Sequence, residues 1–172
     1  MQKTFTIPEL NGLTPPDFVR VVGPVFEHSP WIAEAAWVKR PFTSAQQLHS
    51  ALCQIVTAAG EEQQLALIRA HPDLVGRAAL AGTLTRESTG EQASAGLSQL
   101  TPDEITAFQR NNAAYKDKFG FPFVICARLN KKAAILAGFE SRLKNSRPQE
   151  IKTALEQIFK IAELRLCDLI PH

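Results

Sequence analysis

His71 is the residue of this sequence best suited to proton transfer near neutral pH, because imidazole titrates in that range. It follows a predicted helix and precedes Pro72, which breaks the helical hydrogen-bond pattern. A side chain at such an interrupted helix end is well placed to face a cavity. The same position also suits a histidine that caps the last carbonyl groups of the helix, so both interpretations stay open.

Ser88, Glu91 and Gln92 form a second candidate group. A carboxylate can orient an imidazole or accept hydrogen bonds from a small polar substrate. The spacing also matches a capping box, in which Ser88 begins a helix and Glu91 closes the box. The two interpretations are compatible, because a capped glutamate is held rigidly and a rigid group binds a ligand more precisely.

Two polar residues interrupt otherwise apolar helical stripes. Arg165 lies on the stripe of the last predicted helix, where it either extends to water or stays buried as a receptor for a carboxylate. Asn112 lies on the stripe of the helix that follows Thr101, and we expect its amide to satisfy a backbone group in the core.

Other catalytic signatures are weak or missing from the sequence. It contains no GxGxxG, GxxxxGK[ST], HExxH or GxSxG pattern, which removes the usual support for dinucleotide, phosphate-loop, zincin and nucleophile-elbow chemistry. Histidines and carboxylates do not cluster at metal-ligand spacing, so we predict no metal site. Cys126 with His71 as its base stays open as a nucleophile, although it has no local signature.

Helix start and stop signals are frequent along the whole chain. Capping residues, helix-starting prolines and apolar periodicity predict helices that begin near Thr14, Pro30, Ser44, Glu61, Thr101, Asn130 and Pro148. No alternating pattern of comparable length predicts a strand. We therefore predict an all-α fold, a single-domain helical bundle of about eight helices.

One apolar segment, residues 119–127, does not fit a helix, because Gly120 and Pro122 interrupt it. We expect a short buried strand or an extended apolar connector there. Its backbone N–H and C=O groups have no helical partners, so they must bind elsewhere in the protein or to a ligand.

Length and composition predict one globular domain, residues 1–172, with 45% hydrophobic residues. The net charge of +2 argues against nucleic acid, and no apolar run is long enough for a membrane span. Cys53, Cys126 and Cys167 form no CxxC pair, which favours reduced thiols. The start lacks an apolar leader and the last three residues, 170–172, are not a peroxisomal address, so we expect a cytoplasmic protein.

Three motifs, in order along the chain, resemble those of one known family. They are His71-Pro72-Asp73-Leu74, Ser88-Thr89-Gly90-Glu91-Gln92 with Ala95-Gly96-Leu97, and Phe119-Gly120-Phe121-Pro122-Phe123-Val124-Ile125. Together they resemble the 2-oxo-4-hydroxy-4-carboxy-5-ureidoimidazoline (OHCU) decarboxylases of urate breakdown. The resemblance extends over nearly the whole chain, and the length and predicted helical content agree with it.

The resemblance implies an all-helical carboxy-lyase that uses no cofactor and no metal, is usually a homodimer, and converts the small ureide OHCU into (S)-allantoin and carbon dioxide. It implies His71 and Glu91 as catalytic residues, with His71 as the proton donor. The substrate site that it implies comprises Pro72, Ser88, Gln92, Phe123, Val124, Ile125 and Arg165.

Two alternatives stay open from the residues alone. Amphipathic helices also serve a helical protein-interaction module, and a His–Glu pair also serves a cofactor-free isomerase or hydrolase of a related ureide. Binding of a ureide such as allantoin would separate the enzymes from the interaction module.

Overall fold

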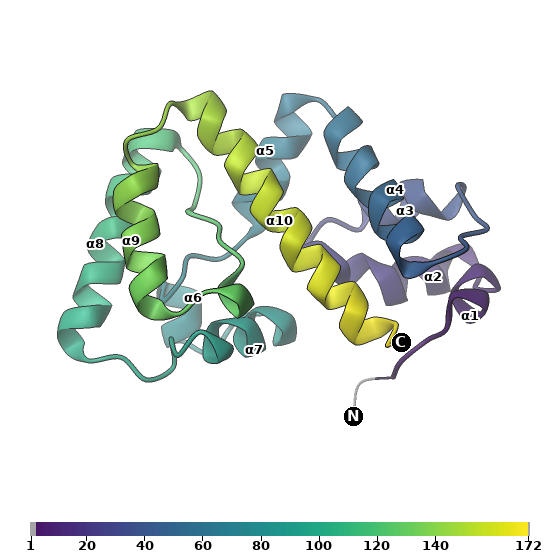
Figure 1. Ribbon diagram of the computed structural model, residues 1–172, viewed down its shortest axis with the longest axis horizontal. Helices are drawn as coiled ribbons and strands as arrows, with labels where there is room; N and C mark the ends of the chain where they lie inside the picture. Colours follow the sequence, from purple (N-terminus) through teal and green to yellow (C-terminus); the bar gives the residue numbers. More distant parts are fainter. Residues whose placement is uncertain (1–2, 172) are drawn as a thin grey trace. The chain divides into compact units, whose positions relative to one another are not determined.

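The computed structural model describes residues 3–171, which form ten α-helices, two short 3₁₀ helices and no β-strand (Figure 1). Eight of the ten α-helices have seven or more residues, so the predicted all-α fold of about eight helices is confirmed. No helix in this range is long and apolar enough to cross a membrane. The prediction from the terminal tripeptide includes His172, which lies outside the described residues.

The first compact unit comprises residues 3–70 and 159–171. Thr14 and Ser44 begin two of its helices, where their side-chain oxygens accept hydrogen bonds from N–H groups three residues later. The apolar faces of its helices enclose a core that includes Phe18, Ile32 and Leu48. Its helices are α1 (Ile7–Asn11), α2 (Pro15–Val22), η1 (Gly23–Val25), α3 (Trp31–Trp37), α4 (Ala45–Ala58), α5 (Glu61–Ala70) and the last part of α10 (Arg147–Leu169).

The second compact unit comprises residues 71–158. Its core is aromatic: the rings of Phe119, Phe121, Phe123 and Phe139 surround the buried ring of Tyr115, with centroid distances of 4.6, 6.0, 5.3 and 6.4 Å. Its helices are α6 (Arg77–Leu80), α7 (Arg86–Ser94), α8 (Pro102–Phe119), η2 (Ala127–Leu129), α9 (Lys132–Arg142) and the first part of α10.

Two predicted helix caps are wrong. Helix α7 begins after Thr85, whose side chain accepts a hydrogen bond from the Ser88 N–H at 3.3 Å. Ser88 is therefore already helical and does not form a capping box with Glu91. Asn130 does not cap α9, because its amide donates instead to the nearby Cys126 carbonyl at 2.9 Å.

The apolar segment between α8 and η2, residues 120–126, is an extended connector and not a strand. Gly120 ends α8 in the left-handed conformation, with φ of 78°, which glycine adopts without steric strain. Phe121, Phe123 and Val124 are then buried in the unit. The structure thus confirms the extended connector and excludes the alternative of a strand.

Candidate active site

His71 begins the loop of residues 71–76, which follows α5 and leads into α6 (Figure 1). Pro72 prevents the helix from continuing through His71. His71 is buried, with 7% of its surface exposed. The loop brings an imidazole to an interrupted helix end, as the sequence predicts.

Side-chain amides from two helices hold the backbone of this loop. Gln92 of α7 accepts a hydrogen bond from the Val75 N–H at 3.1 Å and donates to the Asp73 carbonyl at 3.4 Å. Asn112 of α8 donates to the Leu74 carbonyl at 2.8 Å. Non-helical backbone groups in a buried loop need such partners. The expectation that Asn112 serves a backbone group in the core is therefore confirmed.

The loop conformation is strained at Val75. This β-branched residue has a φ of +53°, in the left-handed region that such side chains rarely adopt. Backbone of this kind costs about 1–3 kcal/mol and persists only where its surroundings enforce it. The chain turns so tightly at the next residue, Gly76, that an added Cβ there would lie 2.6 Å from the Cβ of Asp73. The amides of Gln92 and Asn112 supply the enforcing contacts.

Helix α7 carries Ser88, Glu91 and Gln92 at helical spacing, which places them on one side of the helix. Ser88 and Gln92 are buried and Glu91 is half-buried. The helix packs against η2, directly after the extended connector. Burial raises the pKa of the Cys126 thiol, and the nearby negative charge of Glu91 raises it further. Cys126 is therefore a poor nucleophile at neutral pH.

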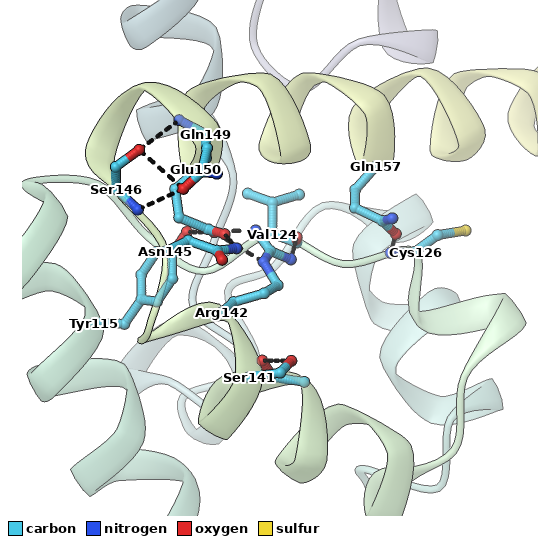
Figure 2. Close-up of polar contacts among 11 residues, drawn as sticks. Tyr115, Val124, Cys126, Ser141, Arg142, Asn145, Ser146, Gln149, Glu150 and Gln157 are labelled. Atoms are coloured by element: carbon cyan, nitrogen blue, oxygen red, sulfur yellow. Dashed lines mark hydrogen bonds and ion pairs between the residues drawn. The ribbon is translucent and has the colours of Figure 1, made fainter.

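The connector is anchored at two backbone groups. Arg142 donates from Nη1 to the Val124 carbonyl at 2.6 Å, and the Cys126 N–H donates to Oε1 of Gln157 at 3.0 Å (Figure 2). In the described part of the chain, the backbone N–H groups of Phe123, Val124 and Ile125 have no hydrogen-bond partner. Three neighbouring donors thus stay available in a mostly buried segment.

A buried ionic network around Arg142 holds the connector in place. The Arg142 Nε donates to the Glu150 carboxylate at 2.8 Å, and Asn145 donates to the other carboxylate oxygen at 2.7 Å (Figure 2). The Tyr115 hydroxyl also donates to Glu150. Burial and this hydrogen bond raise the pKa of Tyr115, so its hydroxyl stays protonated. The Arg142 guanidinium also lies over the Phe123 ring, 4.3 Å from its centroid.

All but one of the predicted site residues belong to the unit of residues 71–158: His71, Pro72, Ser88, Glu91, Gln92, Phe123, Val124 and Ile125. Arg165 belongs to the other unit, where it donates to the Glu27 carboxylate at 2.9 Å and to the Pro24 carbonyl at 3.1 Å. Arg165 is buried, so the interpretation that it extends to water is wrong and the buried alternative holds. Within residues 3–171, no group of three or more His, Cys, Asp and Glu side chains could hold a metal ion.

The network of Arg142, Glu150 and Tyr115 was not predicted from the sequence. One signal was available for Glu150: it precedes Ala154 and Ile158 by four and eight residues, so it lies on the buried stripe of α10. An acidic residue on such a stripe needs a buried partner. Nothing local in the sequence identified Arg142 as that partner.

Comparisons with known proteins identify the family of this chain. The OHCU decarboxylase family model matches residues 11–167. The 2-oxo-4-hydroxy-4-carboxy-5-ureidoimidazoline decarboxylase of Haloferax volcanii is 43% identical over 95% of this chain and 95% of its own. The uric acid degradation bifunctional protein of Bacillus sp. is 42% identical over 94% of this chain and 31% of its own. A crystal structure of (S)-allantoin synthase matches with a TM-score of 0.78 at 30% identity, over 96% of this chain and 54% of that one. The chain therefore belongs to the OHCU decarboxylase family.

Proposed function

We propose that the loop 71–76, helix α7 and the connector 120–126 form the site at which this chain decarboxylates OHCU to (S)-allantoin. The chain is a carboxy-lyase of urate degradation. The observation that carries the site assignment is the pair of hydrogen bonds from Gln92 to the loop, because they join two of the three family motifs within one compact unit.

The substrate supplies its own electron sink. The carbon that bears the carboxylate and the hydroxyl is bonded to the carbon of a ring C=N bond. When carbon dioxide leaves, the released electron pair forms a C=C bond between these carbons, and the C=N pair moves to nitrogen, which takes a proton. A proton then adds to the ureido-bearing carbon while the hydroxyl loses its proton and becomes a carbonyl. The protein has to orient the carboxylate and deliver the proton to one face.

His71 delivers that proton in our proposal, and Glu91 orients the imidazole or binds the hydroxyl and ureido N–H groups. An imidazole suits this step because it exchanges protons near neutral pH. The restrained loop supports the role, since a proton donor must be held precisely to select one face of the product.

The connector binds the ureide through its free N–H groups. Urea and hydantoin carbonyls are strong acceptors, and the N–H groups of Phe123, Val124 and Ile125 are donors without a partner in the described chain. Pro72 and Ser88 complete the binding surface. Gln92 also contributes to this surface. Its amide uses one N–H and one oxygen lone pair to bond the loop, so its second N–H and second lone pair can bind the substrate.

Arg165 is proposed to act on the substrate carboxylate, which a guanidinium binds with two parallel hydrogen bonds. Lysine keeps the charge but not this planar geometry, so Arg165→Lys should lower kcat/KM. Wild-type kinetics in that variant would leave Arg165 with a structural role, through its bonds to Glu27 and Pro24.

The assembly and location complete the proposal. We propose that residues 1–172 act as one family domain, because one family model spans both compact units. We also propose a homodimer without cofactor or metal, which the family resemblance supports, and a location in the cytoplasm. Sedimentation at micromolar concentration tests the dimer, and full activity after exhaustive chelation tests the cofactor-free reaction.

The deciding experiment compares His71→Asn with wild type on freshly generated OHCU. Loss of the proton donor should lower kcat by about 10²-fold or more, the usual scale of general acid–base assistance. Because OHCU also decarboxylates unaided to racemic allantoin, the enantiomeric excess should fall as well. His49→Asn is the matched control, since His49 bonds the Phe159 carbonyl in the other unit. A folded His71→Asn variant that makes one enantiomer at the wild-type rate would remove His71 from the reaction.

A further inference from the structure

We infer that Asn112 is a positioning residue of the decarboxylation, because it fixes the peptide group that keeps the loop 71–76 in its strained conformation. The inference rests on the proposed function, in which His71 at the start of this loop delivers the proton. Asn112 acts through the loop and is not itself the proton donor.

Asn112 and Gln92 hold the same peptide group from its two sides. The Leu74 carbonyl and the Val75 N–H belong to one peptide plane, in which Asn112 donates to the oxygen at 2.8 Å and Gln92 accepts from the nitrogen at 3.1 Å. A peptide whose carbonyl and N–H are both bonded cannot rotate without breaking two hydrogen bonds. The two amides come from different helices, so the orientation of this plane is fixed by the tertiary structure.

This plane directly precedes the strained dihedral angle. Rotation of the 74–75 peptide by about half a turn would carry the φ of Val75 from +53° into the β region, which β-branched residues prefer. The strain thus favours rotation, and the bonds from Asn112 and Gln92 oppose it. If Asn112 is removed, the carbonyl side of the plane loses its restraint.

Rotation at this peptide would displace His71, because the loop between them is short and stiff. Only Pro72 and Asp73 separate His71 from Leu74, and the proline ring fixes one of the intervening dihedral angles. The Asp73 carboxylate is also bonded to Lys116 at 2.7 Å, one helical turn after Asn112. The loop is therefore attached to α8 at two successive turns.

The bonding of Asn112 shows that its amide does more than fill space. It is 5% exposed, and its Oδ1 is buried without a hydrogen-bond partner in the described chain. A half-satisfied amide destabilises a core relative to an apolar side chain of the same shape. The hydrogen bond that its N–H donates to the Leu74 carbonyl explains why an amide side chain occupies this position.

The test compares Asn112→Leu and Asn112→Asp with wild type on OHCU, since Leu keeps the branched shape of the side chain, Asp keeps its size, and both lose the N–H donor. We expect kcat to fall about tenfold to hundredfold, the scale of a misplaced catalytic group, with KM within about twofold. The enantiomeric excess of allantoin should fall too. Asn11→Leu is the matched control: Asn11 bonds the Phe42 carbonyl and N–H at 2.8 Å each in the other unit, so this variant loses stability but keeps the enantiomeric excess.

A second comparison separates positioning from direct contact with substrate. In the His71→Asn background, Asn112→Leu should lower the rate by less than about twofold, because the group that it positions is already gone. If Asn112→Leu lowers the rate by the same factor in the His71→Asn background as in wild type, the inference is wrong. It is also wrong if a folded Asn112→Leu variant keeps the wild-type kcat and enantiomeric excess. If Asn112→Leu does not fold, Asn112→Asp is judged by the same criteria. A wild-type chain that leaves OHCU unchanged contradicts the proposed function instead, so the two failures are distinguishable.

Discussion

The loop 71–76 and the connector 120–126 are both non-helical, and the protein holds them by opposite means. Neutral amides from Gln92 and Asn112 hold the loop, together with one ion pair near the surface. The connector is held by a buried, charged network around Arg142 and by stacked aromatic rings. The loop is strained at Val75, whereas the only left-handed residue of the connector is Gly120, which adopts that conformation freely.

The difference fits the roles that we propose for the two segments. In our proposal the connector binds the ureide through backbone N–H groups, which a buried ionic network holds in place because its rearrangement costs much free energy. In our proposal the loop carries the proton donor, His71, and buried charges nearby would alter its proton exchange. The amides of Gln92 and Asn112 restrain the backbone of the loop without adding a charge of their own. We therefore expect changes at the connector to affect stability first and changes at the loop to affect turnover first.

The largest effect on stability should come from Arg142→Met. The substitution leaves the Glu150 carboxylate buried without its cation and the Val124 carbonyl without its donor. Breaking a buried pair in this way costs about 3–5 kcal/mol, measured as the free energy of unfolding in urea. Arg142→Met combined with Glu150→Leu should recover most of it, because no unpaired charge remains. If the single substitution costs less than about 1 kcal/mol, the connector is not held by this network.

Gly76→Ala should have the second largest effect. Its Cβ would lie 2.6 Å from that of Asp73, so the loop must shift, at about 1–3 kcal/mol for an overpacked site. We expect turnover to fall more than stability, since the shift reaches His71. Gly90→Ala is the stability control, because an added Cβ in the middle of α7 meets nothing within 4 Å and should stabilise the helix by about 0.5–1 kcal/mol. Unchanged turnover in Gly76→Ala would show that the loop tolerates displacement.

Thiol alkylation measures how firmly the connector is held. Cys126 at its end is buried, and burial raises the pKa of Cys53 to about 11, whereas Cys167 is exposed. At pH 8 Cys167 should react first and Cys126 slower by about tenfold or more, as followed by mass spectrometry. Arg142→Met should speed the reaction of Cys126. Equal rates for Cys126 and Cys167 in wild type would mean that the connector opens readily.

Lys116→Met should have the smallest effect. The ion pair of Lys116 with Asp73 has N and O 2.7 Å apart, yet the lysine side chain is 46% exposed. Pairs of this kind contribute about 0–1 kcal/mol and are weakened by salt. The difference in unfolding free energy between variant and wild type should therefore shrink further in 1 M NaCl. If Lys116→Met lowers the free energy of unfolding by more than about 2 kcal/mol, this pair is one of the main restraints of the loop.

Local signals in the sequence were enough to predict the longer helices and the motifs, but not the short helices α1 and α6. The cap at Thr101 and the stop at Gly120 act within a few residues, so α8 agrees with its prediction. The cap predicted at Ser88 was wrong because several candidates compete: Thr83, Thr85, Ser88 and Thr89 lie close together, and only the backbone conformation selects Thr85.

Long-range partners could not be predicted in this way. Arg165 pairs with Glu27, 138 residues away, and Tyr115 bonds Glu150, 35 residues away. The sequence shows that Arg165 and Glu150 lie on buried stripes, but the identity of the opposite charge depends on the fold. The strained φ of Val75 was equally invisible, because it is imposed by amides on two other helices.

The network behind the connector also constrains how this sequence can diverge. Arg142 bonds Glu150, Tyr115 and the Val124 carbonyl, so one side chain serves three segments. A lineage that replaces any one charged member passes through an intermediate weakened by about 3–5 kcal/mol, out of the roughly 5–15 kcal/mol that a domain has. Joint replacement avoids that intermediate but requires two mutations at once. Descendants of this chain should therefore keep Arg142 and Glu150 together or lose both, while the residues of half-buried surface pairs such as Lys132 with Glu104 change independently.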